Sequence, residues 1–235
     1  MPLLGSAAML LSFDLLPEAI AEHDDWHTHE HLPERLSIPG FLRGSRWVAT
    51  QGQPRYLVLY EVGELATLTS AAYLERLNNP SAWTSKMMPH YRRMSRGLCV
   101  VAGSFGVGMG NVTYLIRFKP RAEAAESLRR WLLHEVLPAL PARRGIGSAH
   151  LLEGGSEAPM TREQRIRGTD ASVDSALLLM GYDSNALLEL SRGALARHEL
   201  ERRGATEVVH GLYSIDYSLA HEEVGSTRRV PRRSR

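Results

Sequence analysis

The chain has 235 residues, of which 43% are hydrophobic and 23% charged, ordinary proportions for a globular protein. Its formal net charge is +2, but residues 228–235 hold five arginines and no acid, so the rest of the chain carries −3. A mildly acidic body argues against nucleic-acid binding, which usually needs a clustered basic face. We expect residues 220–235 to form a disordered arginine-rich tail, with weak binding to anionic surfaces as the alternative.

One cysteine, Cys99, is present, which excludes an intramolecular disulfide and fits a reducing compartment. Its neighbours Gly97, Leu98, Val100 and Val101 are apolar, so we predict a buried core residue rather than a nucleophile. Residues 1–11 lack the basic start of a signal peptide, and no run of about 18 apolar residues could span a membrane. These features predict a cytoplasmic protein.

The first half predicts the element order β-α-β-β-α-β. Residues 9–15 form an apolar run of strand length. Residues 18–37 have a helical composition, and Pro33 should kink or end that helix. Further strands are expected at 41–50, 55–62 and 98–105, a hairpin turn at 51–54 and a second helix at 64–77.

The second half repeats this order. The motif Trp-x-x-His-Glu-x-Leu-Pro occurs at 26–33 and again at 131–138, an offset of 105 residues that also aligns Gly40 with Gly145. Such a long period indicates a duplicated domain rather than a solenoid. Strands are expected at 112–118, 147–152, 175–182 and 208–217, and helices at 122–140 and 185–203.

We therefore expect an N-terminal unit at 1–105, a glycine-rich linker at 106–110 and a C-terminal unit at 111–219. The linker lacks the lysine of a phosphate-binding loop. The second unit carries an inserted polar segment, 153–173, where the first has only a short turn. Long loops are usually lids or disordered, and here we favour a disordered segment or surface flap over a functional lid.

A β-α-β-β-α-β unit is the ferredoxin-like motif. Residues 24–26, 30–36, 39–41, 46 and 56–61 resemble the dimeric α+β barrel superfamily, in particular its EthD-like and muconolactone-isomerase-like branches. The resemblance is good over 9–105 and weaker, but in register, over 110–220. It implies an α+β fold in which two tandem ferredoxin-like units pack as an intramolecular barrel. Superfamily members include isomerases, cyclases, dehalogenases, haem-using oxygenases and proteins with no known activity.

His27, Glu30, His31 and Glu34 share one face of the first predicted helix. Histidine transfers protons near neutral pH and a carboxylate can orient it. This face predicts a cofactor-independent enzyme acting by isomerisation, cyclisation, elimination or hydrolysis. Its substrate would be a small organic acid, lactone or aromatic catabolite. The alternative is a merely solvated polar face.

The two halves differ at this face. Leu132 and Val136 occupy the positions of His27 and His31, so the unshared histidines are the catalytic candidates. We predict His31 as the acid/base, with Glu30 orienting it and His27 as a further catalytic candidate. Glu30-His31 also matches the signature of the family that the chain resembles. The shared His29 and His134 are predicted to be structural.

Five residues are candidates for substrate binding. Arg46 and Tyr60, on predicted strands, would hold a carboxylate and an oxyanion if their faces point inward. Trp83, His90 and Tyr91 lie in a segment, 81–93, that could roof a pocket or fill a core.

Two cofactor-dependent alternatives were weighed. His27-x-x-Glu30-His31 matches the inverted zincin pattern, but it has no third ligand at a diagnostic spacing, so no metal site is predicted. A haem-dependent oxygenase with a histidine ligand and a non-catalytic ligand-binding protein stay open. The expected partner is a small-molecule substrate, with a possible homodimer and neither nucleic acid nor membrane.

Overall fold

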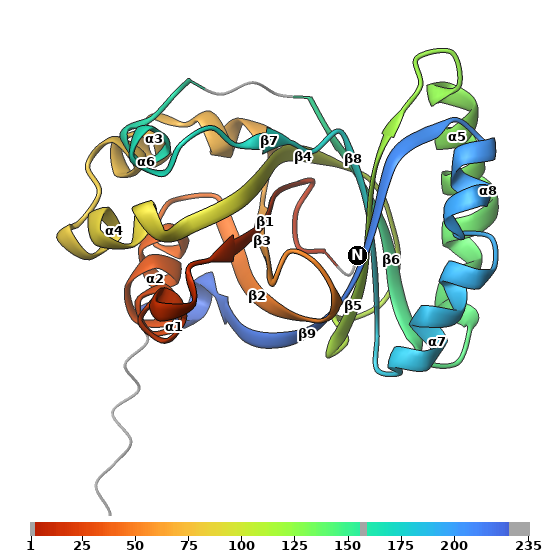
Figure 1. The fold of residues 1–235 in the computed structure, drawn as a ribbon, viewed down its shortest axis with the longest axis horizontal. Coiled ribbons are helices and arrows are strands. Elements are labelled where there is room, and N and C mark those ends of the chain that lie inside the picture. The colour runs from red at the N-terminus through yellow and green to blue at the C-terminus, as the bar shows by residue number, and fades with distance from the viewer. Residues whose placement is uncertain (1–2, 156–158, 226–235) are drawn as a thin grey trace, which may run out of the picture.

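The structure, a computed structural model, describes residues 3–155 and 159–225. A closed barrel of eight strands lies between two helix layers (Figure 1). The strand order is β1-β3-β2-β9-β5-β8-β6-β4, and the barrel closes because β4 also pairs with β1. The predicted α+β fold of two tandem ferredoxin-like units is confirmed. Among the described residues, no helix is long and apolar enough to cross a membrane.

The N-terminal half contains four strands and four α-helices. They are β1 (Ala7–Leu15), α1 (Ile20–Trp26), α2 (Leu32–Leu36), β2 (Phe41–Gly52), β3 (Tyr56–Val62), α3 (Ala71–Asn78), α4 (Ala82–Met87) and β4 (Tyr91–Gly106). A π-helical turn, His27–His31, joins α1 to α2. Pro33 lies in the first turn of α2, where its missing N–H has no helical acceptor to lose, so the helix continues to Leu36. The segment expected to roof a pocket instead forms α4 and the start of β4.

The C-terminal half repeats this order with additional elements. They are β5 (Val112–Pro120), α5 (Ala125–Trp131), β6 (Ile146–Gly154), α6 (Arg162–Arg167), β7 (Ala171–Ser172), β8 (Ser175–Gly181), α7 (Ser184–Glu189), α8 (Arg197–Arg202) and β9 (Ala205–Ala220). A π-helical turn, Leu132–Val136, follows α5. The single helix predicted at 185–203 is interrupted near Gly193, a residue of low helix propensity.

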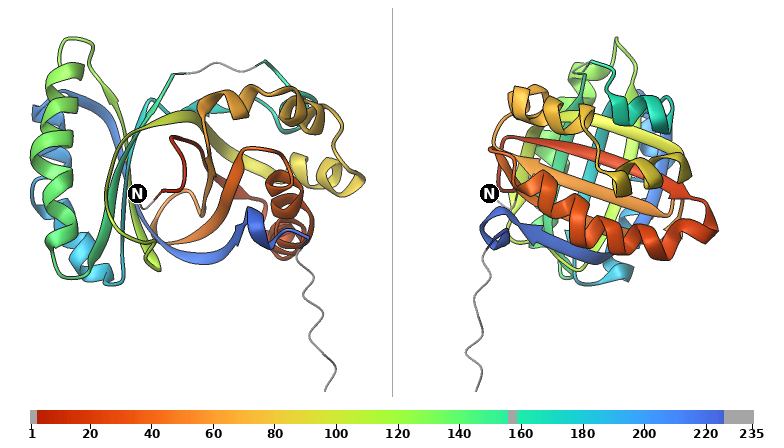
Figure 2. Two further views of the ribbon diagram at one scale, coloured as in Figure 1. Left: turned by 180° about the vertical axis from the view of Figure 1, so that it is seen from behind. Right: turned by 90° about the vertical axis from the view of Figure 1, so that its left-hand side faces the viewer.

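The long strands β4 and β9 join the halves. β4 pairs with β1 of its own half and with β6 of the other, and β9 pairs likewise with β5 and β2. Alternate residues of β1 face opposite sides: Met9 packs in the helix layer, whereas Leu10 packs inside the barrel. Cys99 lies in this interior at 0% exposure, which confirms the prediction of a core cysteine. Figure 2 shows the two helix layers on opposite sides of the barrel.

The inserted segment is ordered over residues 159–173, so the expectation of disorder is wrong there. Thr161 and Gln164 form a capping box that begins α6, and this pairing specifies a helix start that apolar periodicity does not reveal. α6 packs against α3 of the N-terminal half (Figure 1). The disorder predicted from residue 220 onward is wrong for residues 220–225, where β9 ends and His221–Glu223 form a helical turn held by a hydrogen bond between His221 and the Leu36 carbonyl. Residues 156–158 of the inserted segment and residues 226–235 of the predicted tail lie outside the described residues.

Candidate active site

A small cavity lies between the N-terminal sheet and its helix layer, beneath α6. The first helix lines it with His31 and Arg35, and α3 with Tyr73 and Leu77. The strands line it with Met9, Leu11, Tyr60 and Arg96, and the inserted segment with Thr161, Glu163, Gln164 and Arg167. Its volume is about 30 Å³, far below the several hundred Å³ of sites for organic ligands. The cavity is therefore closed to such ligands in this structure.

Three buried histidines form a row along the first helix. His23, His27 and His31 are 0%, 2% and 8% exposed, and consecutive ring centroids are 5.4 and 5.6 Å apart. Their spacing of four residues places them on one helix face. His23 was not among the predicted site residues, although its spacing of four residues from His27 repeats that of His27 from His31.

The row has hydrogen-bonding groups along its length. Tyr60 Oη lies 3.3 Å from His27 Nε2, and Tyr91 Oη lies 3.1 Å from His23 Nε2. Asp24 Oδ1 lies 3.1 Å from His23 Nδ1. The Nδ1 atoms of His27 and His31 are buried and have no hydrogen-bond partner in the described part of the chain.

Burial keeps this row uncharged at neutral pH. Burial lowers the pKa values of His27 and His31 well below the usual 6.5, and the neighbouring cations add to the effect. Burial also lowers the pKa of His23, although Asp24 opposes this shift. Burial likewise raises the pKa of Tyr60 well above its usual value. The cavity therefore presents a neutral imidazole, which can accept a proton, beside a phenol that retains its own.

A buried ion pair fastens the inserted segment over the cavity. Arg35 Nη2 donates to Glu163 Oε1 at 2.5 Å, and the two side chains are 2% and 4% exposed. Burial opposes the charge on Arg35, but Glu163, Tyr73 and Glu34 outweigh it, so the pKa of Arg35 is raised. Arg167 is held within the segment by Asp170 at 2.5 Å. The C-terminal half thus covers the site of the N-terminal half.

Arg96 supplies the unpaired cation of the cavity. It lies opposite Leu11 in the β1–β4 pairing and is partly buried. Among the described residues its side chain has no ion-pair or hydrogen-bond partner, whereas the side chains of Arg35 and Arg167 are both paired. Its guanidinium can therefore bind an anionic group on a ligand. The sequence did not single out Arg96 as a site residue, because Arg92 and Arg93 lie in the same strand.

Glu30 does not orient His31. Its carboxylate accepts from Trp26 Nε1 at 3.2 Å and from Ser81 Oγ at 2.5 Å, and Ser81 caps α4. The prediction is wrong because the side chain turns toward α4. Glu30 therefore anchors α4 to the first helix. For the same reason its carboxylate cannot join His27 and His31 in a zincin-like arrangement.

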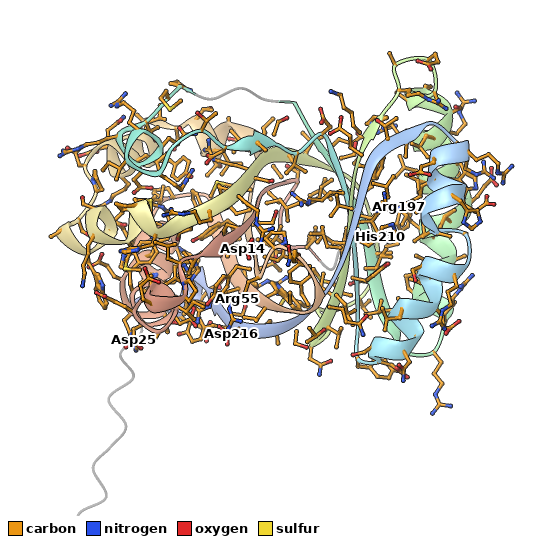
Figure 3. All side chains as sticks on the ribbon, viewed as in Figure 1. Asp14, Asp25, Arg55, Arg197, His210 and Asp216 are labelled. Atoms are coloured by element: carbon orange, nitrogen blue, oxygen red, sulfur yellow. The ribbon has the colours of Figure 1, made fainter. Side chains whose placement is uncertain are left out.

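Arg46 lies in the same helix layer but away from the cavity. It donates to Asp216 at 2.6 Å, to the carbonyl of Asp24 at 3.1 Å and to Thr28 at 3.1 Å. Figure 3 marks Asp216 on β9, at the edge of this layer. Because its donors are engaged, Arg46 ties α1 to β9 and is not the predicted carboxylate-binding residue.

The three residues predicted to roof a pocket are placed elsewhere. Trp83 donates to Glu22 at 3.1 Å, outside the cavity. His90 joins α4 to β4, and its carbonyl accepts from Leu16. Tyr91 bonds His23 at the far end of the histidine row. The shared His29 and His134 are exposed on the helix surface.

The C-terminal half has apolar residues at the corresponding positions. Leu132 and Val136 replace His27 and His31, and Leu140 stands 105 residues after Arg35. Leu179 lies opposite Tyr114 on β5, just as Tyr60 lies opposite Met9 on β1. Leu179 therefore occupies the position that corresponds to Tyr60. All of these leucine and valine side chains belong to one buried apolar cluster. The polar site is therefore confined to the N-terminal half, whereas the π-helical turn occurs in both.

The site offers neither a described metal-binding cluster nor, in its present shape, room for a haem. Over residues 3–155 and 159–225, no group of three or more histidine, cysteine, aspartate or glutamate side chains is arranged to hold a metal ion. A haem, like any aromatic ligand, exceeds the present cavity volume of about 30 Å³, because sites for ligands of that size span several hundred Å³. His31 also packs against the Trp26 ring, with centroids 4.3 Å apart.

Comparison with known proteins identifies the fold. No family model matches the sequence, and no curated protein matches it significantly. An anthrone oxidase-like protein superposes with a TM-score of 0.67 at 12% identity, covering 95% of this chain and 97% of that chain. A provisionally named monooxygenase from Fusobacterium nucleatum gives 0.59 at 7% identity, covering 92% and 95%. At such identities the likeness concerns the fold alone: the chain is a dimeric α+β barrel in which both ferredoxin-like units belong to one polypeptide.

Proposed function

We propose that the N-terminal half is the active half of a cofactor-independent enzyme that removes a proton from a small anionic or phenolic aromatic substrate. His31 is the base, and Arg96 binds the anionic group of the substrate. Tyr60 and His27 keep the base in place. The names of the fold neighbours, an anthrone oxidase-like protein and a monooxygenase, support an enzymatic role in which the deprotonated substrate reacts with oxygen.

The observation that carries this proposal is the state of His31. It is a buried imidazole with an unpartnered Nδ1 in a cavity that also holds an unpaired guanidinium. An imidazole kept neutral by burial accepts a proton most readily when the other product is an anion beside it, since the two charges then stabilise each other. Arg96 would stabilise that developing anion.

The closed cavity requires a movement before the substrate binds. A drug-sized or aromatic ligand occupies several hundred Å³, far more than the present volume of about 30 Å³. The inserted segment is the element that can open, because within the described part of the chain it alone covers the cavity from the other half, through Thr161, Glu163, Gln164 and Arg167. Closure over a bound substrate would exclude water from the base.

The finer family assignment also remains a proposal. The fixed offset of 105 residues and the equivalent strand pairings of β1 and β5 support a tandem duplication. The residues around Glu30-His31 support the EthD-like and muconolactone-isomerase-like branches. In those branches the deprotonated substrate would rearrange or eliminate instead of reacting with oxygen. A homodimer stays a prediction.

The proposal is tested by proton exchange in deuterated water. Anthrone, whose methylene protons are acidic, is the first probe, followed by small aromatic acids. We expect the protein to accelerate hydrogen–deuterium exchange at the acidic carbon, and His31→Gln to lower that rate by about 10²–10⁴-fold, the usual contribution of a general base. His29→Gln, an exposed histidine of the same helix, is the control and should retain the rate.

Oxygen consumption, measured with an oxygen electrode, distinguishes the two possible reactions of the deprotonated substrate. Oxygen consumption with the same dependence on His31 supports an oxygenase, and exchange without oxygen consumption supports an isomerase or lyase. Equal rates for wild type and His31→Gln would remove His31 from the mechanism. A Soret band that appears with added haemin and is lost in His31→Ala would instead favour the haem-dependent alternative.

A further inference from the structure

We propose that the chain binds a small oxyanion, a carboxylate or phosphate, at a second site at one end of the barrel. This site, the Arg117 groove, consists of two adjoining hollows that share Ser95, Arg117 and Ala171. Their volumes are about 430 and 470 Å³, in the range of small-molecule sites. Unlike the closed cavity beside His31, the groove has room for a ligand as it stands.

Arg117 is the central residue of the groove. Neighbouring residues on β5, such as Ile116 and Phe118, face the helix layer, so Arg117 faces the barrel side with Leu115. Its Nε is buried and has no hydrogen-bond partner, and its guanidinium makes no ion pair with any described residue. Burial lowers the pKa of Arg117, and Tyr213 opposes this shift. A partly desolvated guanidinium without a partner is costly to the folded state, and an oxyanion would remove that cost.

The surroundings of Arg117 suit an oxyanion. Ser95, on β4, offers a hydroxyl in both hollows, and Lys119 and Arg197 add positive charge to one of them. Figure 3 marks Arg197 close to β9. The acidic residues of the same hollow, Asp174 and Glu207, are exposed, as are Lys119 and Arg197. Cations outnumber acids in this hollow, and the partly buried Arg117 is the least exposed of its charged residues.

The backbone is strained on both sides of the groove. Arg93 and Glu207 are the non-glycine residues with positive φ in the described part of the chain, each at 52°. Arg93 lines one hollow and Glu207 the other. Such strain is common where a structure holds a binding site in shape. Both residues lie where β4 and β9 shift register against their neighbours.

Arg117, the central residue of the groove, has no counterpart in the first half. The residue 105 positions before Arg117 is Ser12, which is buried in β1 and pairs with Ser95. An arginine therefore stands in one half at a position where the other has a small hydroxyl side chain. General barrel packing does not explain this difference, because the other half packs without an arginine.

The test is isothermal titration with inorganic phosphate and, separately, with succinate, at constant ionic strength. At least one probe should bind wild type at one equivalent with a dissociation constant of millimolar order or lower. Arg117→Met should weaken that binding by about tenfold or more, as expected for loss of a charged bidentate partner. Arg144→Met, an exposed arginine elsewhere on the chain, is the matched control and should bind as wild type does.

Two further variants separate the sites and the effect on folding. Arg96→Met and His31→Gln should retain the binding, because both residues lie in the other cavity. Arg117→Met should keep the far-ultraviolet spectrum and melt no earlier than wild type without ligand, because it removes an unpartnered guanidinium. Undiminished binding in Arg117→Met, loss of binding in Arg96→Met, or binding of neither probe would each overturn the proposal.

Discussion

Glu163→Gln tests whether the inserted segment is a lid held shut by one ion pair. The substitution preserves the size of the side chain and removes its charge. Wild-type Glu163 accepts from Arg35 at 2.5 Å, with both side chains nearly inaccessible. The variant leaves the Arg35 guanidinium buried with Glu34, 3.2 Å away, as its remaining carboxylate partner.

The expected magnitude follows from this geometry. Removing one member of a buried pair usually costs about 3–5 kcal/mol. Because Arg35 keeps Glu34, we take the lower end, about 3 kcal/mol. α6 lies outside the barrel and contacts the N-terminal half through Ile166, through Arg167 over the Tyr91 ring and through the bond from Arg162 N to Asn78. The loss should therefore fall on local opening of the segment, and about 3 kcal/mol corresponds to a roughly 150-fold larger opening constant.

Amide hydrogen exchange measures this opening directly. The amides of Arg165 and Gly168 donate within α6, and both should exchange about 150-fold faster in Glu163→Gln when exchange reports the opening equilibrium. Glu189→Gln, which removes an exposed pair with Arg192, is the matched control and should change exchange little. Replacing both partners, in Arg35→Met with Glu163→Leu, should restore much of the lost stability.

Two outcomes would refute this reasoning. Unchanged exchange of the α6 amides in Glu163→Gln would mean that the ion pair does not hold the segment. Equal acceleration of the barrel amides and the α6 amides would mean that the pair stabilises the whole fold rather than a lid.

Two further predictions concern the first helix. The folded-state pKa values of His27 and His31 are lowered, so below about pH 6.5 the unfolded chain binds protons that the folded chain does not. Their contribution to stability is present above that pH and is lost on acidification, by at most about 2 kcal/mol per imidazole at pH 5. Urea unfolding at pH 7 and pH 5 should show this dependence, reduced in His31→Phe and unchanged in His29→Gln. Glu30→Gln should lower the free energy of unfolding by about 1–2 kcal/mol, because it weakens the hydrogen bonds to Trp26 and Ser81. The variant should keep the rate of proton exchange on the substrate. A loss of that rate without destabilisation would show that Glu30 belongs to the active site.

The strands were predictable because apolar runs and turn residues are local signals. Residues 55–62 were expected as a strand, and β3 spans Tyr56–Val62 with every residue buried. The difference between the halves was equally informative, because it singled out His27 and His31, which the structure buries beside Tyr60. The ends of β4 were harder to predict, since its first residues, Tyr91 to Arg93, are polar or charged and pair with β1 only in three dimensions.

Side-chain direction could not be predicted for Glu30 and Arg46. A helical wheel assumes 3.6 residues per turn, whereas residues 27–31 form a π-helical turn that rotates the following side chains. Arg46 does lie in the helix layer, but its partner Asp216 is 170 residues away. Pairing between such distant segments leaves no periodic pattern in either one.

The insertion shows most clearly why the site was only partly predictable. A charged segment without apolar periodicity has the composition of a disordered loop. It can nevertheless be ordered if a distant part of the chain provides a buried partner for one of its charges. Arg35 is that partner, 128 residues from Glu163. In a symmetric homodimer, each subunit would have to carry both the histidine row and its cover. A single chain with two units is free of this constraint, so the N-terminal half can hold the histidines while the C-terminal half, apolar at the equivalent positions, supplies the segment that closes over them.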